Sequence, residues 1–237
     1  MVQKMALTLL FIINILNTIC PQSMLINLTQ KSQESVKVVD KIIERKDKNL
    51  CLNVVIPEIK YLNNVDKENE INLNISNNTA KWIRGVEEIT KEYFQDGIQT
   101  LFPYEANSRY KVVRNDKKFI SLYIDYYQFT GGAHGITNRV AYTIDMKTDD
   151  ILLLNDLFKD GFNYKKVING EIKKQISKNK DMYFDEGTIF KGIKEDEKFY
   201  IDRSNLVIYF NQYEIAPYSA GIIGFSIPIS LFKDNFI

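Results

Sequence analysis

The sequence is poor in the residues from which metal sites and disulfide bonds are built. Its 237 residues include two cysteines, Cys20 and Cys51, and one histidine, His134. Structural zinc is usually held by about four His or Cys ligands, so we expect no metal site of that type and no cofactor. If the segment that holds Cys20 is removed, Cys51 has no partner for an internal disulfide. Its place in an apolar, strand-like run favours a core position over a nucleophile.

The sequence also lacks an excess of charge of one sign. Its 31 basic and 30 acidic residues give a formal net charge of +1 at pH 7. Nucleic-acid binding depends on a positive field that attracts phosphates, so we expect no DNA or RNA partner. The length and the 45% hydrophobic content are those of a globular protein with one or two domains and a substantial core. We find no internal repeat and no low-complexity linker.

The first 28 residues predict the compartment. Lys4 precedes an apolar run from Met5 to Ile15, and a weaker apolar patch ends at Leu28. A short basic start before an apolar core of this size is typical of a secretory signal. Two alternatives stay open, an uncleaved membrane anchor and a lipoprotein attached through Cys20, although the residues before this cysteine do not suit a lipobox. We therefore interpret residues 1–28 as a signal peptide or membrane anchor and 29–35 as a tether. The rest is expected to be extracytoplasmic, secreted or membrane-anchored, with contact to the membrane only through residues 1–28.

The pattern of apolar residues predicts an α+β fold, with a mainly antiparallel sheet and two principal helices packed on it. Helical spacing is found at 71–94 and 164–178, whereas 61–70 is polar and is expected to be a loop. Pro57 is expected to end the second strand or to lie at an edge. Strand-like runs cover residues 36–43, 50–56, 109–114, 119–129, 135–145, 199–201, 206–210 and 222–229.

The run 119–129 shows the clearest two-residue alternation. One face is apolar and the other is rich in aromatic residues. The aromatic face is consistent with two alternatives, a binding surface and cross-strand packing under a helix. The apolar face carries Ile120, Leu122, Ile124 and Tyr126, and the other carries Phe119, Ser121, Tyr123, Asp125, Tyr127 and Phe129.

Two motifs with small residues interrupt the strands of the C-terminal half. They read Thr130-Gly131-Gly132-Ala133-His134-Gly135 and Tyr213-Glu214-Ile215-Ala216-Pro217-Tyr218-Ser219-Ala220-Gly221. Glycine permits a positive φ and close backbone contact. A strand follows the first motif where a phosphate-binding loop would lead into a helix, so a tight strand connection is favoured. We expect His134 to be buried and bonded to the backbone, and Glu214, if buried, to pair with Arg139, Arg203 or the backbone near His134.

Together these motifs resemble the extracellular domain of the RsiV-type anti-sigma factors. The part from about Val36 to Phe129 is similar to the small domain that also precedes the catalytic domain of the peptidoglycan deacetylase PdaC. The resemblance implies a PdaC-type N-terminal domain at 36–135 and an RsiV-type C-terminal domain at 136–237. The two would form one compact ectodomain outside the membrane of a Gram-positive bacterium. The residues that carry the RsiV resemblance are Tyr126–Gly135, Leu154–Phe158, Phe199-Tyr200, and Tyr209–Gly221 followed by Ile227-Pro228.

The resemblance also implies a function. In RsiV the ectodomain binds lysozyme, so we expect an exported ligand-binding module that recognises lysozyme or cell-wall material such as peptidoglycan fragments. RsiV-type proteins carry a sigma-binding segment before the membrane span, where this sequence has only Met1 to Lys4. We therefore expect neither sigma-factor binding nor a deacetylase domain.

A binding role is favoured over catalysis. The binding candidates come from the aromatic strand face and the two motifs: Tyr123, Tyr127, His134, Tyr213, Glu214 and Tyr218. The alternative is a cell-wall-directed hydrolase or deacetylase-like enzyme that uses His134 and Glu214, with Asp125, as acid and base groups. Nothing in the spacing of these residues demands catalysis, and the sequence has no Gly-x-Ser-x-Gly nucleophile elbow.

Overall fold

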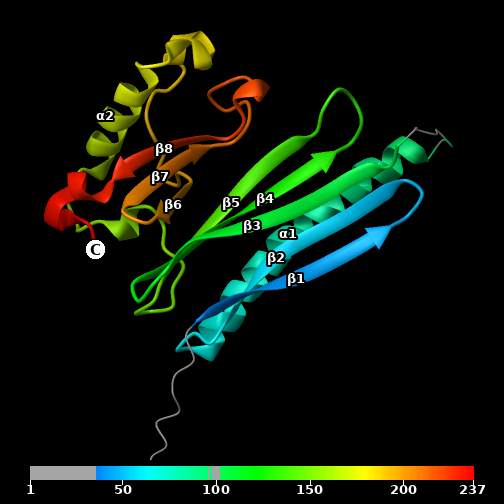
Figure 1. Cartoon of the computed structure of the whole chain (residues 1–237), viewed down its shortest axis with the longest axis horizontal. Coiled ribbons are helices and arrows are strands. Elements are labelled where there is room, and N and C mark those ends of the chain that lie inside the picture. Colours follow the sequence, from blue (N-terminus) through cyan, green and yellow to red (C-terminus); the bar gives the residue numbers. More distant parts are fainter. Residues whose placement is uncertain (1–35, 96, 98–101) are drawn as a thin grey trace, which may run out of the picture. The chain divides into compact units, whose positions relative to one another are not determined.

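The computed structural model, which describes residues 36–95, 97 and 102–237, contains two β-sheets, each with one α-helix against it (Figure 1). The described residues belong to one compact unit. The expected signal or anchor segment, the tether and Cys20 lie outside the described residues. Within the described part of the chain, no helix has the length and hydrophobicity needed to cross a membrane.

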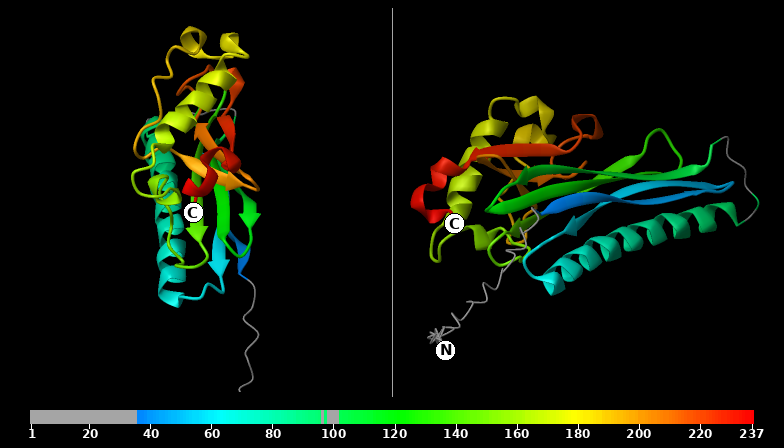
Figure 2. Two further views of the ribbon diagram at one scale, coloured as in Figure 1. Left: turned by 90° about the vertical axis from the view of Figure 1, so that its left-hand side faces the viewer. Right: turned by 60° about the horizontal axis from the view of Figure 1, so that its bottom comes forward.

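The first sheet has five strands in the order of the sequence, from β1 at one edge to β5 at the other. Neighbouring strands are antiparallel except β2 and β3, which are parallel and are connected through helix α1. Figure 2 shows α1 lying along one face of this sheet. The bounds are β1 Lys37–Lys46, β2 Leu50–Lys60, α1 Val65–Phe94, β3 Tyr104–Asn115, β4 Phe119–Phe129 and β5 Ile136–Asp145.

Helix α1 begins earlier than the sequence pattern predicted. The expectation of a loop over 61–70 is confirmed for 61–64 and wrong for 65–70. The Asn64 side chain caps the helix there by accepting hydrogen bonds from the backbone N–H groups of Asp66 and Lys67, at 2.9 and 3.2 Å. Acidic residues in the first turn also favour a helix N-terminus. The polar composition of this segment therefore reflects helix capping. Ile71, Ile75 and Val86 bury the inner face of the helix.

We expected Pro57 to end the second strand or to lie at an edge. Strand β2 in fact continues through this residue. Pairing between β2 and β3 stops at Val54, so Pro57 lies where β2 has only β1 as a neighbour. Past this point the side chain of Asn72 in α1 bonds both the N–H and the C=O of Ile59, each at 2.8 Å. The proline is tolerated because β2 is locally an edge strand, and the asparagine takes over the hydrogen bonds that a neighbouring strand would make.

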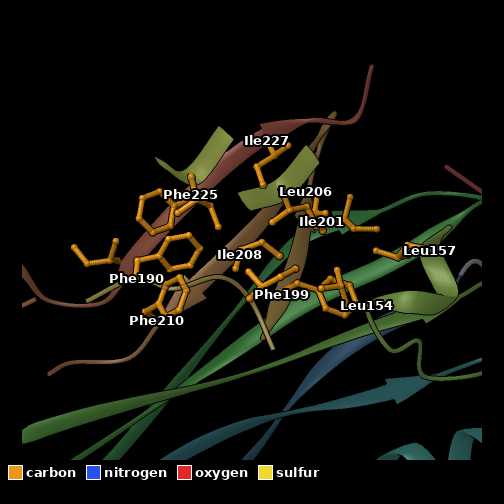
Figure 3. Close-up of a cluster of buried hydrophobic side chains, with 14 of the residues drawn as sticks. Leu154, Leu157, Phe190, Phe199, Ile201, Leu206, Ile208, Phe210, Phe225 and Ile227 are labelled. Carbon is orange, nitrogen blue, oxygen red and sulfur yellow. The ribbon is translucent and has the colours of Figure 1, made fainter. Parts of the chain in front are cut away.

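The second sheet is antiparallel, with strands β6, β7 and β8 in that order. Its core packs against helix α2, Tyr164–Ile176, through Ile168, Ile172 and Ile176. Figure 3 shows the side chains of the three strands and of the 154–157 segment gathered in this core. The strands are Phe199–Asp202, Asn205–Phe210 and Ile223–Pro228, and short 3-10 helices lie at Asn155–Leu157, Lys180–Met182, Phe184–Gly187, Tyr218–Ala220 and Ile229–Asn235. The predicted α+β class, mainly antiparallel with two principal helices, is confirmed.

The two sheets meet where β6, an edge strand of the second sheet, contacts β3, β4 and β5. The predicted alternation of β4 is confirmed, because Ile120, Leu122 and Ile124 lie in the core under α1 while Phe119 joins the core of the second sheet. Ser121 is fully buried between the sheets. Its Oγ accepts a hydrogen bond from the backbone N–H of Ile201 at 2.8 Å and lies 2.8 Å from the hydroxyl of Thr143.

Ser121→Ala is expected to lower the free energy of unfolding by about 1–3 kcal/mol, because the buried N–H of Ile201 would lose its acceptor. Urea unfolding of the purified full chain measures this change. Ser226→Ala in β8 is the matched control, since Ser226 is exposed and its side chain makes no hydrogen bond to any described residue; its effect should stay within about 0.5 kcal/mol. Equal stability of the two variants would contradict this account of the contact between the sheets.

Candidate functional site

The first glycine motif forms the connection between β4 and β5. Gly131 and Gly132 have φ values of 89° and 87°, which side-chain-bearing residues rarely adopt. Gly135 is buried, and a Cβ atom there would lie 2.5 Å from the carbonyl oxygen of Gln128 and from the ring of Tyr127. The motif is therefore a tight strand connection, as predicted, and it presents His134 at its end.

The second motif lies in the connection between β7 and β8, which is held against the open edge of β5. The N–H of Thr137 donates to Oε1 of Gln212 at 2.7 Å, and the N–H of Arg139 donates to Oδ1 of Asn211 at 2.8 Å. The hydroxyl of Tyr209 donates to the carbonyl of Arg139 at 3.2 Å. These side chains occupy edge groups of β5 that would otherwise be free for another strand. They also bring the two motifs together.

An aromatic cluster forms where the motifs meet, and we define it as His134, Tyr213 and Tyr218. The rings of His134 and Tyr218 are stacked, with centroids 3.7 Å apart and planes 16° from parallel. The ring of Tyr213 lies 6.0 Å from that of Tyr218, and its hydroxyl lies 3.4 Å from Nε2 of His134. Three of the predicted binding residues are thus neighbours, although His134 lies about 80 positions before the two tyrosines in the sequence.

His134 is exposed, so the expectation of a buried histidine is wrong. Its expected hydrogen bond to the backbone is present, since Nδ1 lies 3.0 Å from the carbonyl oxygen of Gly135. A carbonyl oxygen can only accept a hydrogen bond, so Nδ1 of His134 must carry the proton and donate it. In a neutral imidazole the other nitrogen, Nε2, then has no proton and can accept a hydrogen bond from the hydroxyl of Tyr213. Stacking on Tyr218 covers one face of the imidazole and leaves the ring on the surface.

The backbone that carries the two tyrosines is constrained. Tyr213 has a φ of 67°, in the left-handed region, and Gly221 has φ 68° and ψ −150°, a conformation that essentially only glycine adopts. A left-handed residue other than glycine costs roughly 1–2 kcal/mol. Surrounding contacts must offset this cost. They include the hydrogen bonds that close the 211–214 turn around Tyr213 and those of Asn211 and Gln212 to β5.

Glu214 is exposed and does not pair as expected. Its carboxylate forms an ion pair with Lys198, and Oε2 accepts a hydrogen bond from the backbone N–H of Asn211 at 2.9 Å, which closes the 211–214 turn. Arg139 instead forms a two-point ion pair with Asp125, both distances being 2.7 Å. Among the described residues, no hydrogen bond or ion pair connects Glu214 with His134. The proposed acid–base pair is therefore not assembled in this structure.

Tyr127 lies beside the aromatic cluster, whereas Tyr123 does not. Burial raises the pKa of the Tyr127 hydroxyl, and the nearby Glu105 and Tyr218 raise it further. Tyr123 instead packs between the sheets, with its ring 5.2 Å from that of Tyr200 and 3.6 Å from the guanidinium carbon of Arg139. The second sheet therefore covers the strand face around Tyr123. We had expected either a free binding surface or packing under a helix there.

Family models match two stretches of the chain. Residues 43–137 match a model described as deacetylase PdaC, and residues 155–230 match one described as a protein of unknown function, DUF3298. The chain is 28% identical to the anti-sigma-V factor RsiV of Bacillus subtilis, over 86% of this chain and 74% of RsiV. It is also 28% identical to the peptidoglycan-N-acetylmuramic acid deacetylase PdaC of the same organism, over 65% of this chain but only 33% of PdaC.

Solved structures show the same fold. A DUF3298 family protein from Bacteroides fragilis superimposes with a TM-score of 0.65 at 17% identity, over 86% of this chain and 95% of that one. Another from Pseudomonas aeruginosa gives a TM-score of 0.56 at 17% identity, over 85% and 94% of the two chains. The chain is RsiV-like with a PdaC-like small domain, which confirms the resemblance in the motifs. The likenesses to RsiV and PdaC support a module related to the cell envelope.

Gly135→Ala is expected to destabilise the fold by about 1–3 kcal/mol, because the added methyl group would overlap the Gln128 carbonyl and the Tyr127 ring. Gly85→Ala in α1 is the matched control. Nothing lies within 4 Å of its added Cβ, and alanine should stabilise the helix by about 0.5–1 kcal/mol. Thermal or urea unfolding measures both. A neutral Gly135→Ala variant would contradict the close packing assigned to this motif.

Proposed function

We propose that this chain is an exported, cell-envelope-associated binding module that recognises a protein such as lysozyme, or peptidoglycan fragments, through its aromatic cluster. The single observation that carries the proposal is the stacking of exposed His134 on half-buried Tyr218, with exposed Tyr213 beside them. In this proposal residues 1–28 are the signal peptide or membrane anchor and 29–35 the tether. Residues 36–135 and 136–237 are the two parts of the recognition module.

The rings of the aromatic cluster suit recognition by contact. Tyrosine and histidine offer a large apolar surface with a polar tip, and tyrosine is enriched at protein interfaces. Tyr213 is 48% exposed, so much of its side chain is available to a ligand. Two adjacent ring systems can stack on a sugar or occupy a cleft in a partner. Tyr127, beside the cluster, extends the same surface.

The hydrogen bonds that hold the loop support a preformed site. Asn211 and Gln212 tie the 211–222 segment to β5, so binding would not have to order a mobile loop. Holding a loop in its bound conformation reduces the entropy lost on association. A small aromatic surface can then bind with useful affinity.

The comparisons support the choice of partner. Similarity to an anti-sigma factor favours a protein partner, and lysozyme is the ligand that the RsiV resemblance implies. The PdaC-like half and the peptidoglycan named for that relative favour cell-wall material as the other candidate. The pairing of Glu214 with Lys198, away from His134, favours binding over acid–base chemistry.

Tyr218→Ala is expected to weaken binding of lysozyme, or of muropeptides if these are the ligand, by about 30-fold or more, since a central aromatic anchor is worth about 2 kcal/mol. Isothermal titration calorimetry with the purified full chain measures both ligands. Tyr93→Ala is the control, an exposed tyrosine on α1 outside the cluster, and it should bind like the wild type. If neither ligand binds at high micromolar concentration, or if Tyr218→Ala binds normally, the proposal is wrong.

The same preparations test the enzyme alternative. Peptidoglycan incubated with the wild type is examined for released or deacetylated products, alongside the Glu214→Gln and His134→Ala variants. The binding proposal expects no turnover from any of them. Turnover by the wild type that both variants lose while they remain folded would favour the enzyme instead.

A further inference from the structure

Asp149 is a buried carboxylate with an unused oxygen. It lies in the turn after β5, it is 2% exposed, and its φ is 58°. One oxygen, Oδ2, accepts a hydrogen bond from the backbone N–H of Asn64 at 2.8 Å. The other, Oδ1, is buried and has no hydrogen-bond partner among the described residues. A buried charge that is only partly satisfied is costly, and such a group calls for an explanation.

Asp149 lines a pocket of about 480 Å³. Carboxylates dominate its polar lining, and Lys67 is its one basic residue. This lysine is already engaged by Asp150 at 3.0 Å and Glu70 at 3.1 Å. The acidic lining residues are Glu70, Asp145, Asp149, Asp150 and Asp156.

Three of these carboxylates have no basic side chain as a partner within the described part of the chain. Asp145 accepts from the backbone N–H of Lys147 at 2.7 Å, and Asp156 from that of Leu153 at 2.8 Å. Backbone donors satisfy single oxygens but leave the negative charge unneutralised. Together with Asp149, the pocket therefore holds an excess of negative charge next to an unfilled acceptor.

We propose that this pocket binds one organic cation, a primary ammonium or a guanidinium, which donates a hydrogen bond to Oδ1 of Asp149. Such a group supplies both the positive charge and the N–H that the site needs. A metal ion fits less well, because the described residues contain no group of three His, Cys, Asp or Glu side chains arranged to hold one. Ile71, Ile151 and Leu152 also line the pocket and can pack against the methylene stem of a lysine or arginine.

The pocket is separate from the aromatic cluster. Strand β5 begins next to His134 at Ile136 and ends in the pocket at Asp145. At about 3.3 Å per residue, the strand places the two sites roughly 30 Å apart. A basic protein could contact both, and a small free amine could occupy the pocket alone. The cation chemistry is the same in both cases.

The test uses the purified full chain and three probes, N-acetyl-lysine amide, N-acetyl-arginine amide and the uncharged N-acetyl-norleucine amide. We expect saturable binding of a cationic probe near the millimolar range and no binding of norleucine amide. Asp149→Asn should weaken that binding at least tenfold. Asparagine tolerates a positive φ, and its side-chain oxygen can still accept the hydrogen bond from the backbone N–H of Asn64. Its amide nitrogen, a donor, takes the place of the unpaired acceptor Oδ1.

Asp160→Asn is the matched control, because Asp160 is exposed and lies outside the pocket; it should bind like the wild type. Thermal melting verifies that both variants fold. Tighter binding of tri-lysine than of lysine amide would indicate a basic protein as the source of the cation, and equal binding per amine would indicate a small amine. The proposal is overturned if neither cationic probe binds, if norleucine amide binds equally, if Asp149→Asn changes nothing, or if Ca²⁺ binds and the amines do not.

Discussion

Strand β4 is buried on both faces, and the rest of the fold depends on this constraint. Its even-numbered residues, such as Leu122 and Ile124, fill the core under α1, while Phe119 and Ser121 face the second sheet. A strand alternates strictly, so a shift of register by one residue would exchange the two sets. The buried hydrogen bond from Ile201 to Ser121 opposes such a shift, because a bulky apolar side chain in that place would leave the N–H of Ile201 without an acceptor. The register of β4 thereby also fixes where the second sheet docks.

The position of the aromatic cluster follows from this docking. With the second sheet seated on β4 and β5, the end of β7 is brought to the open edge of β5, where Asn211 and Gln212 bond Arg139 and Thr137. The same contacts bring Tyr213 and Tyr218 to His134. The site thus belongs to neither half alone. Damage to the packing between the sheets should disturb the cluster even when no residue of the cluster is changed.

Local patterns in the sequence predicted most of the elements, and long-range contacts account for what they missed. Alternation and helical spacing gave the strands and helices, and the glycine motif predicted a tight connection. The start of α1 was missed because the first turn of a helix and a loop are both rich in polar residues. The exposure of His134 and the pairing of Glu214 with Lys198 depend on how two distant loops meet, which no local pattern encodes. Asn211 and Gln212 had no signal beyond their position after a strand.

The strained residue in the aromatic cluster favours a rigid recognition surface. Tyr213 keeps a left-handed backbone although tyrosine gains nothing locally from it, so the contacts around it must favour that geometry over a relaxed one. A loop held in this way presents its rings to a ligand without first losing conformational freedom. The cluster consists of only three rings, and affinity for a partner would therefore depend on this rigidity more than on buried surface. Acid–base catalysis would instead require His134 to share a site with a carboxylate, and the candidate Glu214 is held by Lys198.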